Sequence, residues 1–269
     1  MMNSSTDNIF FAEEASALKG KNMIAVVSGQ CNSGKTWFSI TLANDLSLLK
    51  QRVLIFDADN GLNNIKAQLG INHITDLDNV IYQGYSLNQI ISFYAKGRFD
   101  IIAGNAYSSG LTTMSIGRLQ ILGDDLNIVS QNYDKTILDI KSGLGNVSKV
   151  LTGMAKTSIV VCSDDPQSIT DNYELIKHMS SHYPKISIKI VINQVNNVED
   201  GLRAYSTLVK ACEEFLKISP PLLGVVRQDT RVRDSIRTQS TIVNRYPQSE
   251  ASLDVMAIAK RILNNEQLH

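Results

Sequence analysis

Net charge, cysteine and long apolar runs are all scarce in this sequence. The 269 residues include 26 basic and 26 acidic side chains, so the formal net charge is zero. Zero net charge provides no overall field toward nucleic acid or an anionic membrane, and we find no clear nucleic-acid signal. No apolar run approaches the length of a membrane span. The first twenty residues mix polar residues with one short apolar run, which predicts no signal peptide.

The few cysteines point to a reducing compartment. Cys31, Cys162 and Cys212 do not have the spacing of metal ligands. A low cysteine content is typical of cytosolic proteins with reduced thiols, so we expect a cytoplasmic protein whose cysteines are structural. A hydrophobic fraction of 43% and a charged fraction of 19% fit a soluble protein with a large core. We find no internal repeat and no low-complexity linker.

The most informative stretch is residues 29–36, which has the Gly-x4-Gly-Lys-Thr spacing of a phosphate-binding P-loop. The apolar run 23–27 precedes it and an amphipathic stretch follows, so the loop should join a strand to a helix N-terminus. Backbone N–H groups there can bind phosphate oxygens, Lys35 can reach the outer phosphates, and Thr36 can hold Mg2+. A chance match is the alternative, which this context disfavours. The expected nucleotide-binding residues are Gly29, Gln30, Asn32, Ser33, Gly34, Lys35, Thr36 and Trp37.

Two further apolar runs end in aspartates. Residues 53–56 lead into Asp57 and Asp59, and residues 135–138 lead into Asp139. Carboxylates at the C-terminal ends of parallel strands lie in the ligand crevice of open α/β sheets, so these are candidates for binding Mg2+ and water. The second run has the form of a Walker B strand before a switch loop, where Asp139 would orient Mg2+ through a water. The alternative is that Asp57 and Asp59 cap a helix.

The remaining pattern alternates between strands and helices, which predicts an α/β fold with a doubly wound, mainly parallel sheet flanked by helices. Further strands are expected at residues 79–82, 100–104, 157–162, 186–193 and 222–226. Further helices are expected from residue 87 and at residues 114–133, 166–183, 197–216 and 249–263. Asp229 should cap another helix, which carries Arg231, Arg233 and Arg237. Those arginines would face solvent or grip an acidic partner or phosphates. Residues 7–19 predict a short amphipathic helix that either docks on the domain or is recognised by a partner.

Taken together, these segments resemble the MinD/ParA ATPases over roughly residues 22–264. The resemblance is carried by residues 29–36, 53–64, Asp139 with Gly143, 163–171, 225–233 and 246–252. It implies an ATPase that uses ATP and Mg2+, with a P-loop ATPase domain at residues 22–269 after a tail at residues 1–21. Within the family, residues 57–62 and 168–171 look most like the FlhG group, also called FleN or YlxH, which regulates flagellar number and placement. Asn193, at the end of its strand, matches the family's adenine-reading asparagine.

The resemblance also implies roles in catalysis. Lys35 would neutralise the β- and γ-phosphates, and Thr36 would ligate Mg2+. Asp59 would position the attacking water, so Lys35 and Asp59 are the expected catalytic residues. Asp57 and Asp139 would support the metal. Catalysis of this kind depends mostly on positioning and charge stabilisation.

The two ends of the sequence differ in how well they match the segments through which FlhG proteins bind a partner GTPase and the membrane. FlhG proteins have an Asp-Gln-Ala-x-x-Leu-Arg activator motif that stimulates the GTPase FlhF, and residues 13–19 are similar to it at Ala15 and Leu18. The resemblance therefore implies an FlhF-like GTPase partner for residues 8–19. FlhG proteins also bind membranes through an amphipathic C-terminal helix. Residues 259–269 contain few large apolar side chains, which argues against membrane association.

The P-loop departs from the family pattern Lys-Gly-Gly-x-Gly-Lys-Thr at three positions, Gln30, Cys31 and Asn32. The family's signature lysine reaches across an ATP-bound dimer, whereas Gln30 can donate a hydrogen bond but cannot neutralise charge. Cys31 and Asn32 add side chains where two subunits would approach closely. We hypothesise that Lys141, at a glycine position of the switch loop, partly replaces the missing charge.

Three functions therefore stay open at the level of the sequence. The first is a regulatory ATPase of the FlhG type, whose nucleotide state switches its association with flagellar partners and with a second copy of itself in an ATP-dependent dimer. The second is a nucleotide-binding scaffold with weak or no hydrolysis. The third is a DNA-partition or MinD-like positioning ATPase for another cargo, against which the zero net charge and the short tail argue.

Overall fold

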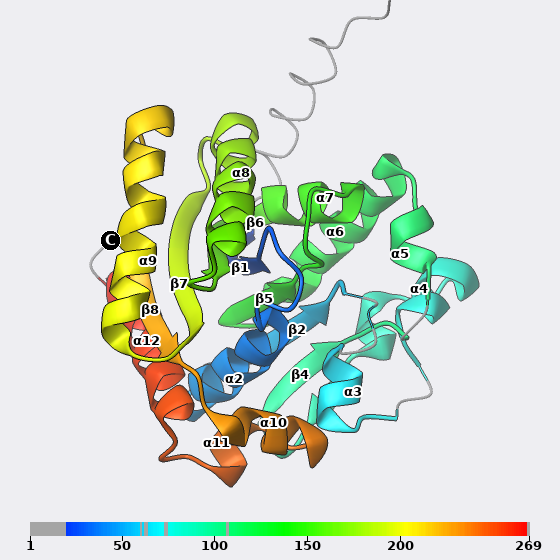
Figure 1. Ribbon diagram of the computed structural model, residues 1–269. Coiled ribbons are helices and arrows are strands. Elements are labelled where there is room, and N and C mark those ends of the chain that lie inside the picture. Colours follow the sequence, from blue (N-terminus) through cyan, green and yellow to red (C-terminus); the bar gives the residue numbers. More distant parts are fainter. Residues whose placement is uncertain (1–19, 60, 62–63, 73–74, 106–107, 268–269) are drawn as a thin grey trace, which may run out of the picture.

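The protein is described here from a computed structural model covering residues 20–59, 61, 64–72, 75–105 and 108–267. Eight strands of this part form one sheet in the order β3-β4-β2-β5-β1-β6-β7-β8 (Figure 1). All neighbouring strands are parallel except β3 and β4. The strands are β1 (Gly20–Val27), β2 (Val53–Asp57), β3 (Ser92–Tyr94), β4 (Phe99–Ile102), β5 (Lys135–Asp139), β6 (Ala155–Cys162), β7 (Ser187–Val195) and β8 (Leu222–Arg227).

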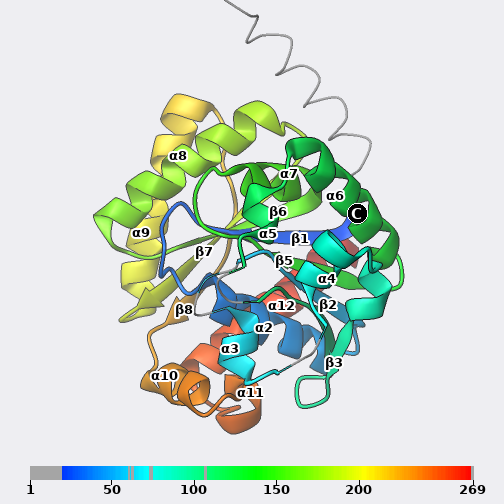
Figure 2. The same ribbon diagram turned by 90° about the vertical axis from the view of Figure 1, so that its right-hand side faces the viewer.

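Helices cover both faces of the sheet, which confirms the predicted doubly wound α/β fold (Figures 1 and 2). On one face lie α4 (Leu77–Gln83), α6 (Ile116–Ser130), α7 (Asn146–Met154), α8 (Pro166–His182) and α9 (Val198–Ala211). On the other face lie α2 (Lys35–Leu48), α3 (Ile65–Leu69), α11 (Ile242–Arg245) and α12 (Glu250–Gln267). The remaining helices are α5 (Gly110–Thr113), α10 (Thr230–Arg237), the 3-10 helix η1 (Leu87–Ile90) and the π-helix η2 (Cys212–Leu216).

The continuous apolar runs of the central strands follow from this two-sided cover. In β1, Ala25 and Val27 belong to the core on one face, whereas Ile24 and Val26 belong to the core on the other. Successive residues of a strand point to opposite faces, so a strand covered on both sides is apolar at most positions. The same register aligns the strand ends, because Asp57 and Asp139 are directly paired across β2 and β5.

One predicted strand is wrong. The sequence pattern predicts a strand at residues 79–82, but these residues lie in α4. Asp76 caps this helix in a capping box with Asn79, and Gly84 ends it in the left-handed conformation. Two matched caps around a short segment outweigh the weak strand preference of its centre.

The helix expected from residue 87 is only the 3-10 helix η1, and the strand β3 follows it where the sequence predicts none. The other predicted elements agree with the structure apart from their boundaries. The helix expected over residues 197–216 is α-helical only to Ala211 and continues as η2, and α12 runs on to Gln267. The side chain of Asp229 accepts a hydrogen bond from the N–H of Arg231, so the predicted cap of α10 is confirmed. Residues 7–19, with the predicted N-terminal helix, lie outside the described residues. Of the helices that are described, none is both long and apolar enough to cross a membrane.

Candidate functional site

The P-loop leads from β1 into the N-terminus of α2. Gly34 is the N-cap residue of α2 and has φ 82, a left-handed conformation that favours glycine. No described side chain caps this helix. Since the first N–H groups of an α-helix have no partners within the helix, those of α2 remain available to a phosphate, with the positive end of the helix dipole behind them.

The side chain of Lys35 is buried at the start of α2, with only 6% of the residue exposed. Its Nζ donates to Oγ of Ser142 at 2.6 Å, and that hydroxyl donates to the carbonyl of Gln30 at 3.0 Å. An ammonium group has three donors, and within the described part of the chain Ser142 accepts one of them. A buried lysine with donors to spare is well suited to bind phosphate oxygens.

Asp139 joins the P-loop helix to β5. It is fully buried and accepts hydrogen bonds from Oγ1 of Thr36 at 2.7 Å and from Oγ of Ser39 at 3.0 Å. Burial raises the pKa of Asp139 to about 6, against the lowering effects of the Thr36 hydrogen bond, the charge of Lys35 and the Ser39 hydrogen bond. Thr36 and Asp139, which the sequence predicts separately as Mg2+ residues, are therefore in direct contact.

Asp57 holds the backbone that follows β2. Its two oxygens accept hydrogen bonds from the N–H groups of Asp59 and Ile65, both at 3.0 Å. Burial, followed by the nearby charge of Asp139, raises the pKa of Asp57 well above its ordinary value. Ile65 is the first residue of α3, so Asp57 accepts a hydrogen bond from the N-terminus of a helix. This contact agrees in part with the alternative prediction that Asp57 and Asp59 cap a helix. Asp59 accepts a hydrogen bond from the N–H of Gly61 at 3.0 Å and faces the pocket.

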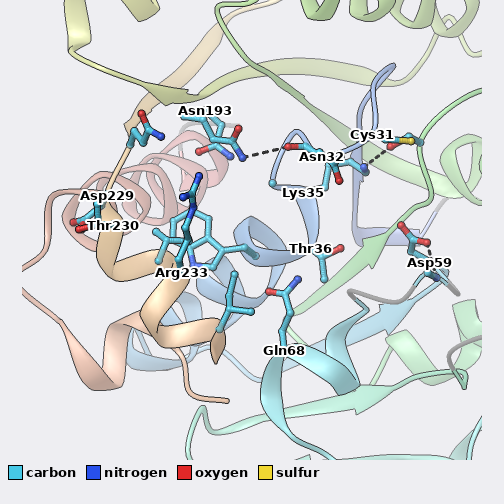
Figure 3. Close-up of a pocket in the computed structure, with 18 of the residues that line it drawn as sticks. Cys31, Asn32, Lys35, Thr36, Asp59, Gln68, Asn193, Asp229, Thr230 and Arg233 are labelled. Carbon is cyan, nitrogen blue, oxygen red and sulfur yellow. Dashed lines mark hydrogen bonds between the residues drawn. The ribbon is translucent and has the colours of Figure 1, made fainter. Parts of the chain in front are cut away.

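These elements surround a pocket of about 570 Å3 (Figure 3). Asp229, Thr230 and Arg233 lie on one side of it and Asp59 on the other, with Lys35 and Thr36 between them. Of the residues expected from the sequence, the lining includes Asn32, Gly34, Lys35, Thr36, Trp37, Asp59 and Asn193. Gly29, Gln30, Ser33, Asp57 and Asp139 are not part of this lining.

Sequence reasoning missed several residues of the pocket wall. The lining residues that it did not select include Gln68, Ser142, Gln194, Gln228, Thr230, Val232 and Ile236. Four of these residues come from α10 and the segment before it, which pack beside α2 only in the folded chain. The arginine-bearing helix had suggested phosphate binding as one reading, and Arg233 does line the pocket.

Trp37 forms an apolar part of this wall. Its residue is 7% exposed, and it belongs to a core against which Val232 and Ile236 of α10 pack. The indole N–H has no hydrogen-bond partner among the described residues. Trp37 is also the single tryptophan of the chain, so its fluorescence can report on the pocket.

The donor set fits Mg2+ only in combination with a bound phosphate. No cluster of three or more histidine, cysteine, aspartate or glutamate side chains that could hold a metal occurs in the described ranges. The oxygens of Thr36 and Asp139 are hard ligands of the kind Mg2+ prefers, and this ion is usually held by one or two protein groups together with substrate phosphates and waters.

Comparison with known proteins gives a consistent picture. The domain family described as "CobQ/CobB/MinD/ParA nucleotide binding domain" matches residues 24–242. The antiactivator FleN of Pseudomonas aeruginosa is 28% identical over 89% of this chain and 85% of its own length. The flagellum site-determining protein YlxH of Helicobacter pylori is 24% identical over 96% and 86%. The structure of MinD from Pyrococcus horikoshii complexed with Mg-ADP has a TM-score of 0.78 at 18% identity and covers 92% of this chain and 98% of that one.

Proposed function

The chain belongs to the CobQ/CobB/MinD/ParA family of nucleotide-binding domains, and from this premise we propose that it binds ATP together with Mg2+. The observation that carries the proposal is the buried ammonium of Lys35 beside an uncapped helix N-terminus in a 570 Å3 pocket. This pocket extends from the P-loop to α10 (Figure 3), and its volume of about 570 Å3 leaves room for a nucleoside as well as a polyphosphate.

The proposed roles follow from where each group lies. Lys35 and the N–H groups of the P-loop bind the phosphates, and Thr36 and Asp139 hold Mg2+, which supplies further neutralisation of phosphate charge. Asp59 faces the pocket and orients a water for attack on the terminal phosphate. Asp57 acts indirectly, because its carboxylate accepts a hydrogen bond from the N–H of Asp59 and so fixes the backbone of that residue.

We further propose that the nucleotide state controls partner binding in a regulator of the FlhG type. The similarity to FleN and YlxH supports this assignment. Residues 8–19 would then engage an FlhF-like GTPase. The test is the GTPase rate of such a protein in the presence of the full chain and of a chain without residues 1–19. Stimulation by the full chain alone is expected, and equal rates with both would contradict the role.

A second candidate is a nucleotide-binding scaffold that hydrolyses ATP weakly or not at all. Cys31 and Asn32 are exposed and line the pocket where the family has glycines. Asn32 has φ 62, a conformation that asparagine tolerates better than most residues, so the loop keeps a glycine-like geometry without glycine. At the signature-lysine position, Gln30 brings no positive charge to the reaction.

Substituting Lys35 by alanine tests the proposed nucleotide binding. We expect Lys35→Ala to weaken ATP binding by about 100-fold or more, because it removes the buried cation that meets the phosphates. Asp59→Ala should retain binding within a few-fold but lose most hydrolysis. The measurements are the fluorescence of Trp37 on titration with Mg-ATP and the release of phosphate.

The matched control is Lys210→Ala, an exposed lysine on α9, which should bind ATP like the wild type. A wild-type chain that does not bind ATP would overturn the proposed function. A wild-type chain that binds ATP but does not hydrolyse it would support the scaffold function over the ATPase.

Lys141 offers a separate prediction. Its side chain is exposed and lines the pocket on the loop after β5. If it supplies part of the charge that Gln30 lacks, Lys141→Ala should lower the ATP hydrolysis rate by about tenfold with little change in affinity. Lys141→Arg, which keeps the charge, should hydrolyse ATP at nearly the wild-type rate. An unchanged rate in Lys141→Ala would rule this role out.

A further inference from the structure

Two neighbouring carboxamides at the end of β7 donate hydrogen bonds to the backbone of the P-loop. Nδ2 of Asn193 donates to the carbonyl of Ser33 at 2.8 Å, and Nε2 of Gln194 donates to the carbonyl of Asn32 at 3.3 Å. The two acceptors are consecutive carbonyl groups of the loop. The contacts join segments that are more than 150 residues apart in the chain.

We propose that Asn193 and Gln194 are positioning residues that set the direction of the phosphate-binding N–H groups. In a planar trans peptide, the carbonyl of one residue and the N–H of the next point in opposite directions. Holding the carbonyls of Asn32 and Ser33 toward β7 therefore turns the N–H groups of Ser33 and Gly34 away from β7. This inference rests on the proposed function and concerns how the same site is preorganised.

The backbone of β7 departs from a regular strand in a way that serves both contacts. Consecutive side chains of a strand point to opposite faces, so a regular strand could direct only one of the two amides at the loop. Gln194 has φ 64, and the pairing of β7 with β8 shifts register between Asn193 and Val195. A left-handed residue other than glycine is strained and persists where its surroundings hold it. Here the left-handed conformation of Gln194 places both carboxamides on the side of the strand that faces the P-loop.

The close packing around Gly34 also supports a positioning role for the two carboxamides. A Cβ at this position would overlap Nδ2 of Asn193 and would lie 3.0 Å from Nε2 of Gln194. The loop thus approaches the two amides as closely as a residue without a side chain permits. Asn193 is also only 2% exposed. The sequence predicts that this residue reads adenine, but its amide donates at least one hydrogen bond to the loop backbone.

A ligand without a base distinguishes positioning from adenine reading. We expect Asn193→Ala and Gln194→Gly each to weaken binding of inorganic tripolyphosphate by about five- to tenfold, in proportion to one lost hydrogen bond. ATP binding should fall by a similar factor. The measurement is isothermal titration calorimetry with each ligand in the presence of Mg2+. Gln194→Gly keeps the left-handed backbone accessible, so the test stands even if Asn193→Ala fails to fold.

Gln131→Ala, which removes an exposed carboxamide outside the pocket lining, is the control and should bind tripolyphosphate like the wild type. Unchanged tripolyphosphate affinity in both variants, with weaker ATP binding in Asn193→Ala, would overturn the positioning role in favour of adenine reading. Failure of the wild type to bind either ligand would overturn the proposed function itself, which is a different result.

Discussion

Asp45→Asn is expected to stabilise the protein by a few kcal/mol near pH 7, with a rise of about 5–10 °C in the melting midpoint. Asp45 lies in α2 and is fully buried, and neither of its carboxylate oxygens has a hydrogen-bond partner among the described residues. Burial raises the pKa of this carboxyl from 3.8 to about 8, and the charge of Lys260 offsets only part of that rise. Folding therefore has to keep a carboxyl protonated that would ionise in the unfolded chain.

The sign of the pH dependence follows from this shift. Below pH 3.8 the carboxyl of Asp45 is protonated in both states and contributes no pH dependence. Between 3.8 and about 8 the unfolded chain releases the proton and the folded chain retains it, so stability falls as pH rises through this window. Asparagine does not titrate. The advantage of Asp45→Asn should therefore be small near pH 4 and largest at pH 8.

Urea unfolding at several pH values between 4.5 and 8 measures this difference directly, and the other titrating groups cancel between the two proteins. Asp125→Asn, which changes an exposed aspartate of α6, is the matched control and should shift stability by less than about 0.5 kcal/mol. A difference between Asp45→Asn and the wild type that does not vary with pH would show that the carboxyl of Asp45 ionises normally in the fold.

Gly29→Ala is expected to have the largest effect on the P-loop. The N–H of Gly29 donates to Oδ1 of Asn172 at 2.9 Å, which holds the loop against α8. A Cβ on Gly29 would overlap the carbonyl group of Asp171 and lie 2.9 Å from the backbone nitrogen of Asn172. Both obstacles are backbone atoms, so neither can move aside like a side chain. We expect a loss of about 3 kcal/mol in stability and at least a 100-fold loss in ATP affinity.

Gly117→Ala is the matched control for this substitution. Gly117 is exposed in α6, and a Cβ there would meet no heavy atom within 4 Å. Alanine favours the helix over glycine, so this variant should be more stable by about 0.5–1 kcal/mol. Thermal unfolding and ATP titration of both variants provide the measurements. Wild-type ATP affinity in Gly29→Ala would show that the P-loop can leave α8 without harm to the site.

Local patterns were enough to predict the parts of the fold that depend on near neighbours in sequence. The apolar runs of β1, β2 and β5 predicted central strands because a two-sided core requires apolar residues at most positions of a strand. The spacing of residues 29–36 predicted the P-loop because its shape is set by a few consecutive residues. The pattern failed at α4, where the caps provided by Asp76 and Gly84 decided the outcome.

Only the tertiary structure decided which groups meet. Lys35 and Ser142 are 107 residues apart, and Asn193 and Ser33 are 160 apart, so no local spacing could pair them. Both contacts arise because parallel strands bring their C-terminal ends to one edge of the sheet. The sequence by itself determined that this protein carries a P-loop between a buried strand and a helix. The packing of β5, β7 and α8 against that loop determined how its lysine is held and where its backbone points, because those interactions depend on segments that meet only after folding.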